Sequence, residues 1–425
     1  MSSRFSGASQ STRRIAVKTP LPDNQLLFRQ MGVAEELSRL FQMDLSLLSI
    51  SPDINLDDLL GKNITIQLQR PDGEMRFFNG FASSAAFGGT EGDFFRYDLV
   101  LRPWFWFLTR TSDCRIFQEK TVPEIIEEVL GDQGFSDYEN KLSGSYRTWE
   151  YCVQYRESDF NFLSRLMEQE GIYYFFRHEN GRHVLVLCDG IGSHTTVPGY
   201  AEIPFYPADG NRRRRDRDHF WHWSASRQLQ PGIYALNDFN FKTPFADLQV
   251  KSTVSNPHAQ ADYEVYDYPG EYTERGEGET YSKARIEETQ QPYQLVAGQG
   301  DAAGVETGAL FTLENHGRDD QNIEYIVVSA QHQLSQGGYQ TNGSEDDDEY
   351  QVSIQAMDSK LPYRAQRSTP KPTVQGPQTA MVVGKEGEEI WTDQYGRVKV
   401  QFHWDRIGQY DENSSCWIRV SQNWA

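Results

Sequence analysis

The sequence predicts a mainly β fold with an α/β insertion: two similar β-barrels, a small domain that contains helices, and the start of a further β-barrel. Three observations lead to this prediction. Aromatic residues, which favour strands, make up 13% of the 425 residues. Apolar and polar residues alternate along several stretches, for example 64–68 and 397–404, as they do in half-buried strands. Two distant stretches, 60–101 and 307–354, repeat one order of strands and loops.

Composition excludes several classes of protein. The net charge is −20, so the surface as a whole repels nucleic acid and anionic membranes, and we expect no nucleic-acid partner. Residues 1–20 contain no apolar segment of the signal-peptide kind, and no run approaches the roughly 18 apolar residues of a membrane helix. The four cysteines form no CxxC pair, which indicates reduced thiols in a protein made in the cytoplasm. We expect any export to bypass the general secretory route.

The N-terminal part of the chain is expected to form the first barrel. Residues 1–20 are rich in Ser and Arg and predict a flexible N-terminus. The barrel itself is expected over 21–110. Within it, Ile64–Leu68 alternates between apolar and polar residues, and Pro71–Gly73 predicts a turn. Further strands are expected at 77–81 and 94–101.

Residues 111–200 are expected to form an α/β insertion with two helices. Thr121 can cap the first helix, with a proline in the first turn and Glu124 placed to return a hydrogen bond to the cap. The second helix is expected over 158–170, capped by Ser158 and ended by Gly171. A hairpin is expected to follow, with strands at 172–176 and 184–187.

The second barrel is expected over 201–360, because this part repeats the order of the first. Leu60-Gly-Lys-Asn-Ile-Thr-Ile corresponds to Thr307-Gly-Ala-Leu-Phe-Thr-Leu. In both stretches a middle strand, a Gly-rich loop and a strand that opens with tyrosine come next. The tyrosine is Tyr97 in the first stretch and Tyr350 in the second. We infer a duplicated β-barrel.

The C-terminal part is expected to contain a linker and an incomplete barrel. Residues 361–378 hold four prolines among Arg, Lys, Ser and Thr, which is typical of a semi-extended linker. The barrel is expected over 379–425 and to stop before it can close. Alternation in 397–404 predicts a strand with a solvent-exposed face that includes Arg397 and Gln401. Asp393–Gly396 predicts the turn of a hairpin with 389–392, in which Gly396 is able to take positive φ.

Clusters of titratable side chains indicate little chemistry. Glu168, Glu170 and nearby His178 resemble an acid–base group, but two carboxylates two positions apart on a helix diverge, and solvated side chains explain them better. His219 and His222 lie three positions apart in an expected strand. They therefore face opposite sides and do not predict a metal site.

Two charged runs are interpreted as loops. Arg212–Arg215 either lies in solvent between domains or meets an acidic neighbour. Glu345–Glu349 carries several carboxylates but lacks the spacing of a calcium loop. No GxSxG, HExxH, GxxxxGK or GxGxxG motif is present, so we expect no catalytic, cofactor-binding or metal-binding residues and no cofactor. Scattered carboxylates of the glycosidase kind need no motif and stay an alternative.

Five blocks, in order along the chain, resemble VgrG proteins, the spike-hub proteins of type VI secretion systems. The most specific block is Val153–Phe176, with the sequence VQYRESDFNFLSRLMEQEGIYYFF. The other blocks are 32–67, 101–118, the proline-rich linker and 391–404.

The resemblance implies a structural protein and not an enzyme. It implies a homotrimer similar to phage tail hubs, in which two barrels per chain form a pseudo-sixfold ring that docks on the hexameric Hcp tube. It also implies that 379–425 begin an OB-type barrel, which in the family leads to a needle, a PAAR-type tip protein and effectors. Baseplate proteins are further expected partners. The protein is expected to contact a membrane only when the spike pierces it. Such a protein is made in the bacterial cytoplasm and exported by the secretion apparatus.

Aromatic residues are expected partly at the trimer interfaces, where such side chains are enriched. The candidates, together with one turn glycine, are Trp104, Trp106, Trp391, Tyr395, Gly396, Phe402 and Trp404. Two interpretations from other classes stay open. One is a cell-wall polysaccharide hydrolase, and the other is a carbohydrate-binding module with exposed tryptophan side chains.

Overall fold

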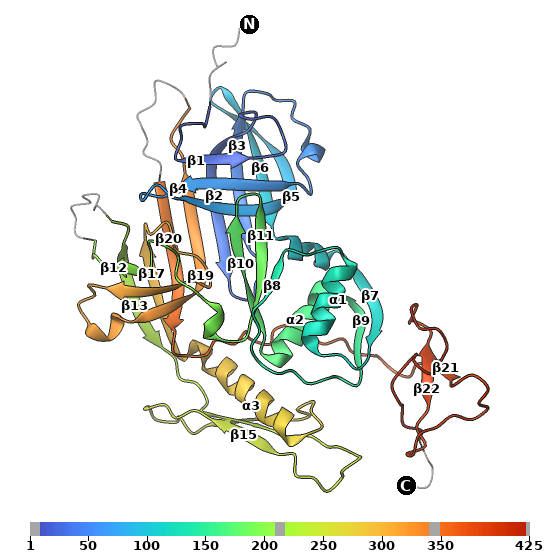
Figure 1. The fold of residues 1–425 in the computed structure, drawn as a ribbon. Helices are drawn as coiled ribbons and strands as arrows, with labels where there is room; N and C mark the ends of the chain where they lie inside the picture. The colour runs from blue at the N-terminus through green and yellow to red at the C-terminus, as the bar shows by residue number, and fades with distance from the viewer. Residues whose placement is uncertain (1–8, 209–216, 340–348, 422–425) are drawn as a thin grey trace. The chain divides into compact units, whose positions relative to one another are not determined.

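A computed structural model describes residues 9–208, 217–339 and 349–421 (Figure 1). The chain divides into two compact units. Unit 1 contains the residues up to Phe105 together with 137–143 and 171–366, and unit 2 contains 106–136, 144–170 and the residues from Arg367 onward. Residues 171–200, expected within the insertion, thus cluster with the sheets of unit 1. The remaining domain limits given above stay predictions.

Unit 1 is built on a twelve-stranded sheet that consists of two similar halves. The strands of the first half lie in the order β4-β5-β6-β3-β2, and those of the second half in the order β18-β19-β20-β17-β13. The first half contains β2 (Leu27–Glu36), β3 (Gln42–Ser49), β4 (Asn63–Gln69), β5 (Met75–Glu91) and β6 (Phe94–Arg102). The second half contains β13 (Phe220–Arg227), β17 (Gln294–Gly300), β18 (Leu310–Glu314), β19 (Glu324–Ser335) and β20 (Glu349–Asp358).

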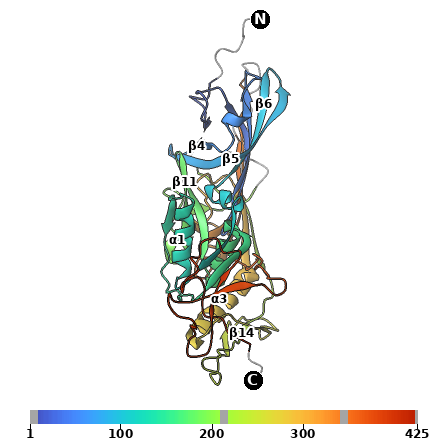
Figure 2. The same cartoon turned by 90° about the vertical axis from the view of Figure 1, so that its right-hand side faces the viewer.

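The two halves thus agree in the order of strands both in the sheet and along the chain, which confirms the predicted duplication. They differ from the prediction in one respect, because the pairing of the described strands makes open sheets and not closed barrels. β2, the last strand of the first half, pairs with β19 of the second half and does not return to β4. The turned view shows β5 and β6 running side by side (Figure 2).

Two irregularities of the ladders recur at the same places in both halves. Between β2 and β3 the register shifts at Phe28–Gln30, and between β13 and β17 it shifts at Phe220–His222. Between β5 and β6 it shifts at Ala82–Ser84, and between β19 and β20 at Val327–Ser329. An extra residue bends and twists a strand, so equal positions of the bulges give the two halves the same local curvature.

A pair of glycines anchors the same turn in both halves. Gly61 has a φ of 70° and donates its N–H to the carbonyl of Ala82 at 2.8 Å. Gly308 has a φ of 82° and donates to the carbonyl of Val327 at 2.8 Å. Positive φ favours glycine, which explains why both copies keep this residue. The predicted correspondence of 60–66 with 307–313 is therefore confirmed.

Smaller elements complete unit 1. A hairpin of β10 (Tyr173–Glu179) and β11 (Arg182–Cys188) agrees with the prediction, and β8 (Tyr138–Asn140) pairs with it. A second small sheet contains β14 (Ile233–Leu236), β15 (Val250–Thr253) and β16 (Glu264–Asp267). The short strand β12 (Glu202–Pro204) pairs with β18.

Helix α3 (Arg275–Gln290) packs on this second sheet and was not predicted. Its sequence carries two glycines and few apolar residues, so no helical stripe marks it. Tyr281 and Ile286 nevertheless join the buried cluster that includes Tyr234 and Val250.

The predicted flexible N-terminus is only partly tested. Residues 1–8 lie outside the described residues. Strand β1 (Ile15–Lys18) pairs with β4 from Ile15↔Leu68 to Lys18↔Thr65, so this part of the N-terminal stretch is ordered. The reason is that Ile15 and Val17 lie on one side of the strand and are buried, whereas Ala16 and Lys18 on the other side are more exposed.

Unit 2 contains a two-stranded sheet and two helices that agree with the sequence. The strands are β7 (Ser112–Phe117) and β9 (Cys152–Ser158), and the helices are α1 (Val122–Asp132) and α2 (Asp159–Glu170). Thr121 and Glu124 form the predicted capping box of α1. Ser158 Oγ accepts the N–H of Asn161 at 3.1 Å at the start of α2. No helix of the described ranges is long and apolar enough to cross a membrane.

The C-terminal segment of unit 2 differs from the prediction in two ways. Strand β22 (Lys399–Phe402) pairs with β21 (Ala380–Val383), and not with 389–392. The predicted turn is present, because Gly396 has a φ of 69° and donates its N–H to the Asp393 carbonyl at 3.1 Å. The prediction of a solvent-exposed face is wrong at two positions, Arg397 and Gln401.

Arg397 and Gln401 are buried there. Arg397 Nε donates to Asp393 Oδ2 at 2.6 Å, and Gln401 Nε2 donates to Asp405 Oδ2 at 3.0 Å. These hydrogen bonds offset the cost of removing the two polar side chains from water.

Candidate functional site: the junction of the two halves

The junction of the two halves is an antiparallel ladder between β2 and β19. It runs from Gln30↔Ser335 to Glu36↔Ser329 and makes one continuous sheet out of both halves. Successive side chains alternate between the two faces of this sheet. The junction therefore has an outer polar face and an inner buried face, and both contain unusual groups.

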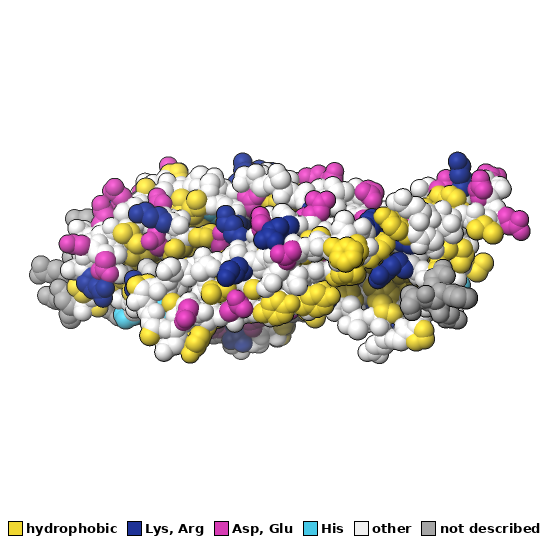
Figure 3. Space-filling view, turned by 90° about the horizontal axis from the view of Figure 1, so that it is seen from below, with side chains coloured by type: hydrophobic (Ala, Val, Ile, Leu, Met, Phe, Trp, Pro, Cys, Tyr) yellow, Lys and Arg dark blue, Asp and Glu magenta, His cyan; other side chains and the backbone are white. Residues whose placement is uncertain are grey.

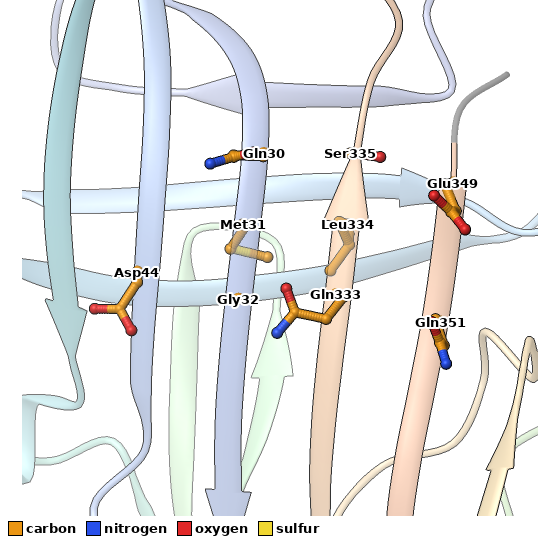
Figure 4. Close-up of a pocket in the computed structure, with 9 residues that line it drawn as sticks. All are labelled: Gln30, Met31, Gly32, Asp44, Gln333, Leu334, Ser335, Glu349 and Gln351. Atoms are coloured by element: carbon orange, nitrogen blue, oxygen red, sulfur yellow. The ribbon is translucent and has the colours of Figure 1, made fainter. Parts of the chain in front are cut away.

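The outer face holds a shallow polar groove of about 470 Å³. Figure 4 shows Gln333 reaching from β19 toward Gly32 of β2, where a Cβ would lie 3.3 Å from the amide nitrogen. Asp44 and Glu349 supply the only charged side chains among the residues that line it, and both are acidic. The complete lining is Gln30, Met31, Gly32, Asp44, Gln333, Leu334, Ser335, Glu349 and Gln351. Amides and carboxylates of this kind bind water and polar surfaces but supply no nucleophile with an adjacent base.

The inner face holds a buried ionic cluster centred on Glu35 of β2. Its carboxylate lies 2.7 Å from His178 Nε2 on β10 and 3.3 Å from His332 Nε2 on β19. Burial raises the pKa of Glu35, but the hydrogen bonds from the two histidines outweigh burial and hold the pKa far below its usual range. Glu35 is therefore an anion in the interior.

The cluster continues to Arg76 of β5 and Tyr350 of β20. Tyr350 Oη lies 2.9 Å from His332 Nδ1, and Arg76 Nη1 donates to Tyr350 Oη at 3.1 Å and to the Ala303 carbonyl at 2.7 Å. The Arg76 guanidinium also lies over the Phe78 ring, 4.4 Å from its centroid. Burial lowers the pKa of His332 to about 4, and the charge of Arg76 acts in the same direction. His332 is thus neutral at pH 7 and bridges Glu35 to Tyr350.

This cluster is structural in character. Its members come from both halves and from the β10–β11 hairpin, so one set of hydrogen bonds ties three parts of unit 1 together. The groups point at one another and are joined by hydrogen bonds. In the described ranges, no group of three or more His, Cys, Asp and Glu side chains is arranged to hold a metal ion.

Trp104 and Trp106, two of the predicted interface residues, fall in different units. The Trp104 side chain is only 3% exposed within its own chain, and its backbone N–H donates to His183 Nε2 at 2.9 Å. Trp106 is half-buried, with the Arg110 guanidinium 4.4 Å from its ring centroid. Trp104 therefore contributes to the core of unit 1.

The structure brings the C-terminal aromatic residues together in two contacts. Trp391 lies 4.6 Å from Trp417 between ring centroids, and Phe402 stacks on Trp404 at 4.9 Å. Trp404 Nε1 also donates to Gln378 Oε1 at 3.1 Å. Tyr395, beside the turn at Gly396, is 47% exposed. Whether these residues lie at an interface between chains stays a prediction.

The other side chains that the sequence singled out do not converge. Glu168 accepts hydrogen bonds from Thr369, whereas Glu170 accepts one from Trp149. His178 is part of the ionic cluster, but its acidic partner is Glu35, which the sequence did not suggest. His219 contacts Asp301 and does not meet a second histidine. Arg212–Arg215 and residues 345–348 lie outside the described residues.

Comparison with known proteins decides the family. Residues 34–338 match the phage tail baseplate hub (GPD) family. The chain belongs to this family. The type VI secretion system spike protein VgrG1b of Pseudomonas aeruginosa is 51% identical over 98% of this chain and 56% of its own length. The hub chain therefore spans little more than half the length of that relative.

Two further comparisons agree with this assignment. The actin cross-linking toxin VgrG1 of Vibrio cholerae is 33% identical over 91% of this chain and 35% of its own length. Among solved structures, the E. coli c3393 protein has a TM-score of 0.68 and 18% identity, and the match covers 95% of this chain and 92% of that one. It is described as a type VI secretion component with structural similarity to the T4 tail proteins gp27 and gp5. The predicted resemblance to VgrG spike proteins is confirmed.

The hub surface also carries exposed apolar side chains. Seen from below, hydrophobic side chains lie beside both acidic and basic ones (Figure 3). In unit 1, several of the most exposed belong to the segment between β14 and α3, namely Phe239, Phe245, Tyr263, Tyr266 and Tyr268.

The ionic cluster is hard to recognise in the sequence for a simple reason. Glu35 and His332 lie almost 300 positions apart, and each is a single polar residue without a local motif. One signal was present. In 31–35, Glu35 falls on the side of the strand that Met31 and Val33 make apolar, and an acid at such a position requires a buried partner.

Proposed function

We propose that this hub chain is a non-catalytic, homotrimeric component of a type VI secretion spike that docks on a sixfold tube of Hcp-like hexamers. The observation that carries the proposal is the identical strand order of the two halves. Three chains with two similar halves each present six similar surfaces, which is the number a hexameric ring requires. Membership of the baseplate hub family supports the same assembly.

The proposal extends to the partners and the route of the protein. It is made in the bacterial cytoplasm and leaves with the secretion apparatus. Baseplate proteins are further partners. A tip protein of the PAAR kind and effectors are attached through regions that its longer relatives contain. The charge balance of −20 supports the expectation of no nucleic-acid partner.

The absence of catalysis is part of the proposal. The side chains of the buried cluster around Glu35 hydrogen-bond to one another, and the polar groups of the groove on the outer face are amides, one hydroxyl and carboxylates. Neither arrangement supplies a nucleophile activated by a base. Incubation with peptidoglycan should release no soluble fragments, and release that depends on a carboxylate of this chain would contradict the proposal.

The assembly is tested by mass and by binding. One chain is 48.9 kDa, and light scattering after size exclusion should give a mass near three chains. One trimer should then bind one purified tube hexamer. A trimer that shows no binding to the tube at any concentration would contradict the docking, and a strict monomer would contradict the hub.

A further inference from the structure

The small sheet of β14, β15 and β16 in unit 1 has a free edge along β16. Its strands lie in the order β15-β14-β16, and among the described residues no strand pairs with the outer edge of β16. Helix α3 packs on one face of this sheet (Figure 1). An uncovered edge presents unpaired N–H and C=O groups, to which another extended segment can add.

Two residues of β16 direct their backbone groups to this edge. Ile233 of β14 faces Glu264 and donates its N–H to the carbonyl of Tyr263 at 3.1 Å. Successive residues of a strand direct their backbone groups to opposite edges, so Val265 also bonds to β14, whereas Glu264 and Tyr266 point the other way. In the part of the chain that the structure describes, no group bonds to the N–H or C=O of these two residues.

The two faces beside the edge differ in chemistry. Val265 is half-buried and packs against the cluster that contains Tyr281 and Ile286 of α3. Glu264 and Tyr266 lie on the opposite face and are exposed, Tyr266 to 54%. A strand that adds here places successive side chains on the two faces. One face therefore offers an apolar neighbour, and the other offers a carboxylate and an aromatic ring.

The surroundings of the edge are acidic and aromatic. Residues 237–279 contain nine acidic and three basic residues. Tyr263 and Tyr268, which flank β16, are 58% and 56% exposed. Carboxylates attract cations, and the faces of tyrosine rings bind cations as well. The edge therefore fits a basic segment better than an acidic one.

Charge also disfavours a second copy of this chain as the occupant. Two β16 strands paired with each other would bring Glu264 and Asp267 of both copies together, and like charges on neighbouring strands destabilise a sheet. Nucleic acid is repelled by the same carboxylates.

We propose that the outer edge of β16 binds an extended basic segment of a partner protein, which adds to the three-stranded sheet as a fourth strand. The segment alternates Lys or Arg with apolar residues. Its cations lie beside Glu264 and Tyr266, and its apolar side chains cover Val265. The inference goes beyond the proposed docking on the tube and does not rest on it.

Peptides of equal charge test the mode of binding. The probe is a fluorescent peptide of ten residues that alternates Lys with Val, and fluorescence anisotropy follows its binding to the full chain. In the proposed pairing the lysine N–H groups bond to Glu264 and Tyr266. The same peptide with N-methylated lysine backbones keeps its charge but loses these donors, and it should bind at least about tenfold more weakly.

Charge reversal locates the site. Glu264→Lys should weaken binding of the lysine–valine peptide by about tenfold, because attraction across the strands becomes repulsion. Glu74→Lys, at an exposed acidic residue elsewhere on unit 1, makes the same change in net charge and should alter the affinity by less than about twofold. Both variants should keep the circular dichroism of the parent. Equal losses of affinity would overturn the proposal, since binding would then follow overall charge alone.

Hydrogen–deuterium exchange identifies the edge that the peptide occupies. Bound peptide should slow exchange in residues 263–268 and leave β15, at the opposite edge of the sheet, unchanged. Protection of another segment without 263–268, equal binding of the N-methylated peptide, or no binding at millimolar peptide would each overturn the proposal.

Discussion

Trp223 lies directly against Gly298, its cross-strand neighbour, and fills the space that a side chain would take. A Cβ built on Gly298 would lie 2.8 Å from Cζ3 of Trp223 and 3.2 Å from Ile354. The equivalent pair in the first half is Met31 with Leu45. At this position of the sheet, the second half pairs a large residue with a glycine, whereas the first half pairs two residues of intermediate size.

This compensation predicts a double-mutant effect. Gly298→Leu overfills the site and should lower the free energy of unfolding by about 1–3 kcal/mol, the usual cost of overpacking. Adding Trp223→Met recreates the pair of the first half and should recover part of that loss. Urea unfolding followed by circular dichroism measures both effects. Additive losses in the double variant would mean that the two positions do not share their space.

Removing the charge of Glu35 should destabilise unit 1 strongly. Glu35→Gln leaves His178 and His332 facing an amide in the interior, and breaking a buried ionic contact costs about 3–5 kcal/mol. Glu36→Gln is the matched control, because the neighbouring side chain is exposed and should change stability by less than about 0.5 kcal/mol. Similar midpoints of denaturation for both variants would show that the cluster contributes no net stability.

The cluster also predicts destabilisation by acid. The folded-state pKa of Glu35 is depressed, so its contribution is present above the unfolded pKa and is lost as pH falls below about 4.3. Burial holds the pKa of His332 at about 4, against about 6.5 in the unfolded chain, so unfolding takes up a proton over this range. The free energy of unfolding should therefore fall between pH 6.5 and 4, with His332 contributing on the order of 3 kcal/mol.

His332→Gln tests how much of this pH dependence of the free energy of unfolding comes from His332. The variant should lose stability at pH 7 but show a shallower dependence on pH between 6.5 and 4. His183 and His194 also have pKa values lowered by burial, so the slope should shrink and not vanish. An unchanged slope would show that His332 does not carry the proton uptake.

The two glycines of the repeated turn should differ in their tolerance of a side chain. At Gly61 an added Cβ meets nothing within 4 Å. Gly61→Ala should therefore lower the free energy of unfolding by only about 1 kcal/mol, the cost of the positive φ. At Gly308 the Cβ would lie 2.8 Å from the Phe175 ring in addition. Gly308→Ala should therefore lower the thermal midpoint more than Gly61→Ala, and the reverse order would contradict the structure.

Local features of this hub were predictable because they depend on neighbours in the chain. The capping box of Thr121 and Glu124 needs residues three positions apart, and the turn at Gly396 needs one residue without a Cβ. The repeated pattern around Gly61 and Gly308 was visible for the same reason. Each of these signals restricts the dihedral angles of a few residues, which sequence can encode directly.

Partners that lie far apart in the chain were decided only by the tertiary structure. β2 joins β19, and β22 pairs with β21 and not with the nearer segment that the sequence suggested. Backbone hydrogen bonds are the same for every strand, so an alternating stretch shows which face is buried but does not name the strand that covers its edge. The Glu35–His332 contact depends on that choice of partner. The sequence by itself thus determined the strands, the caps and the duplication, whereas packing between distant strands decided the junction and its buried charges.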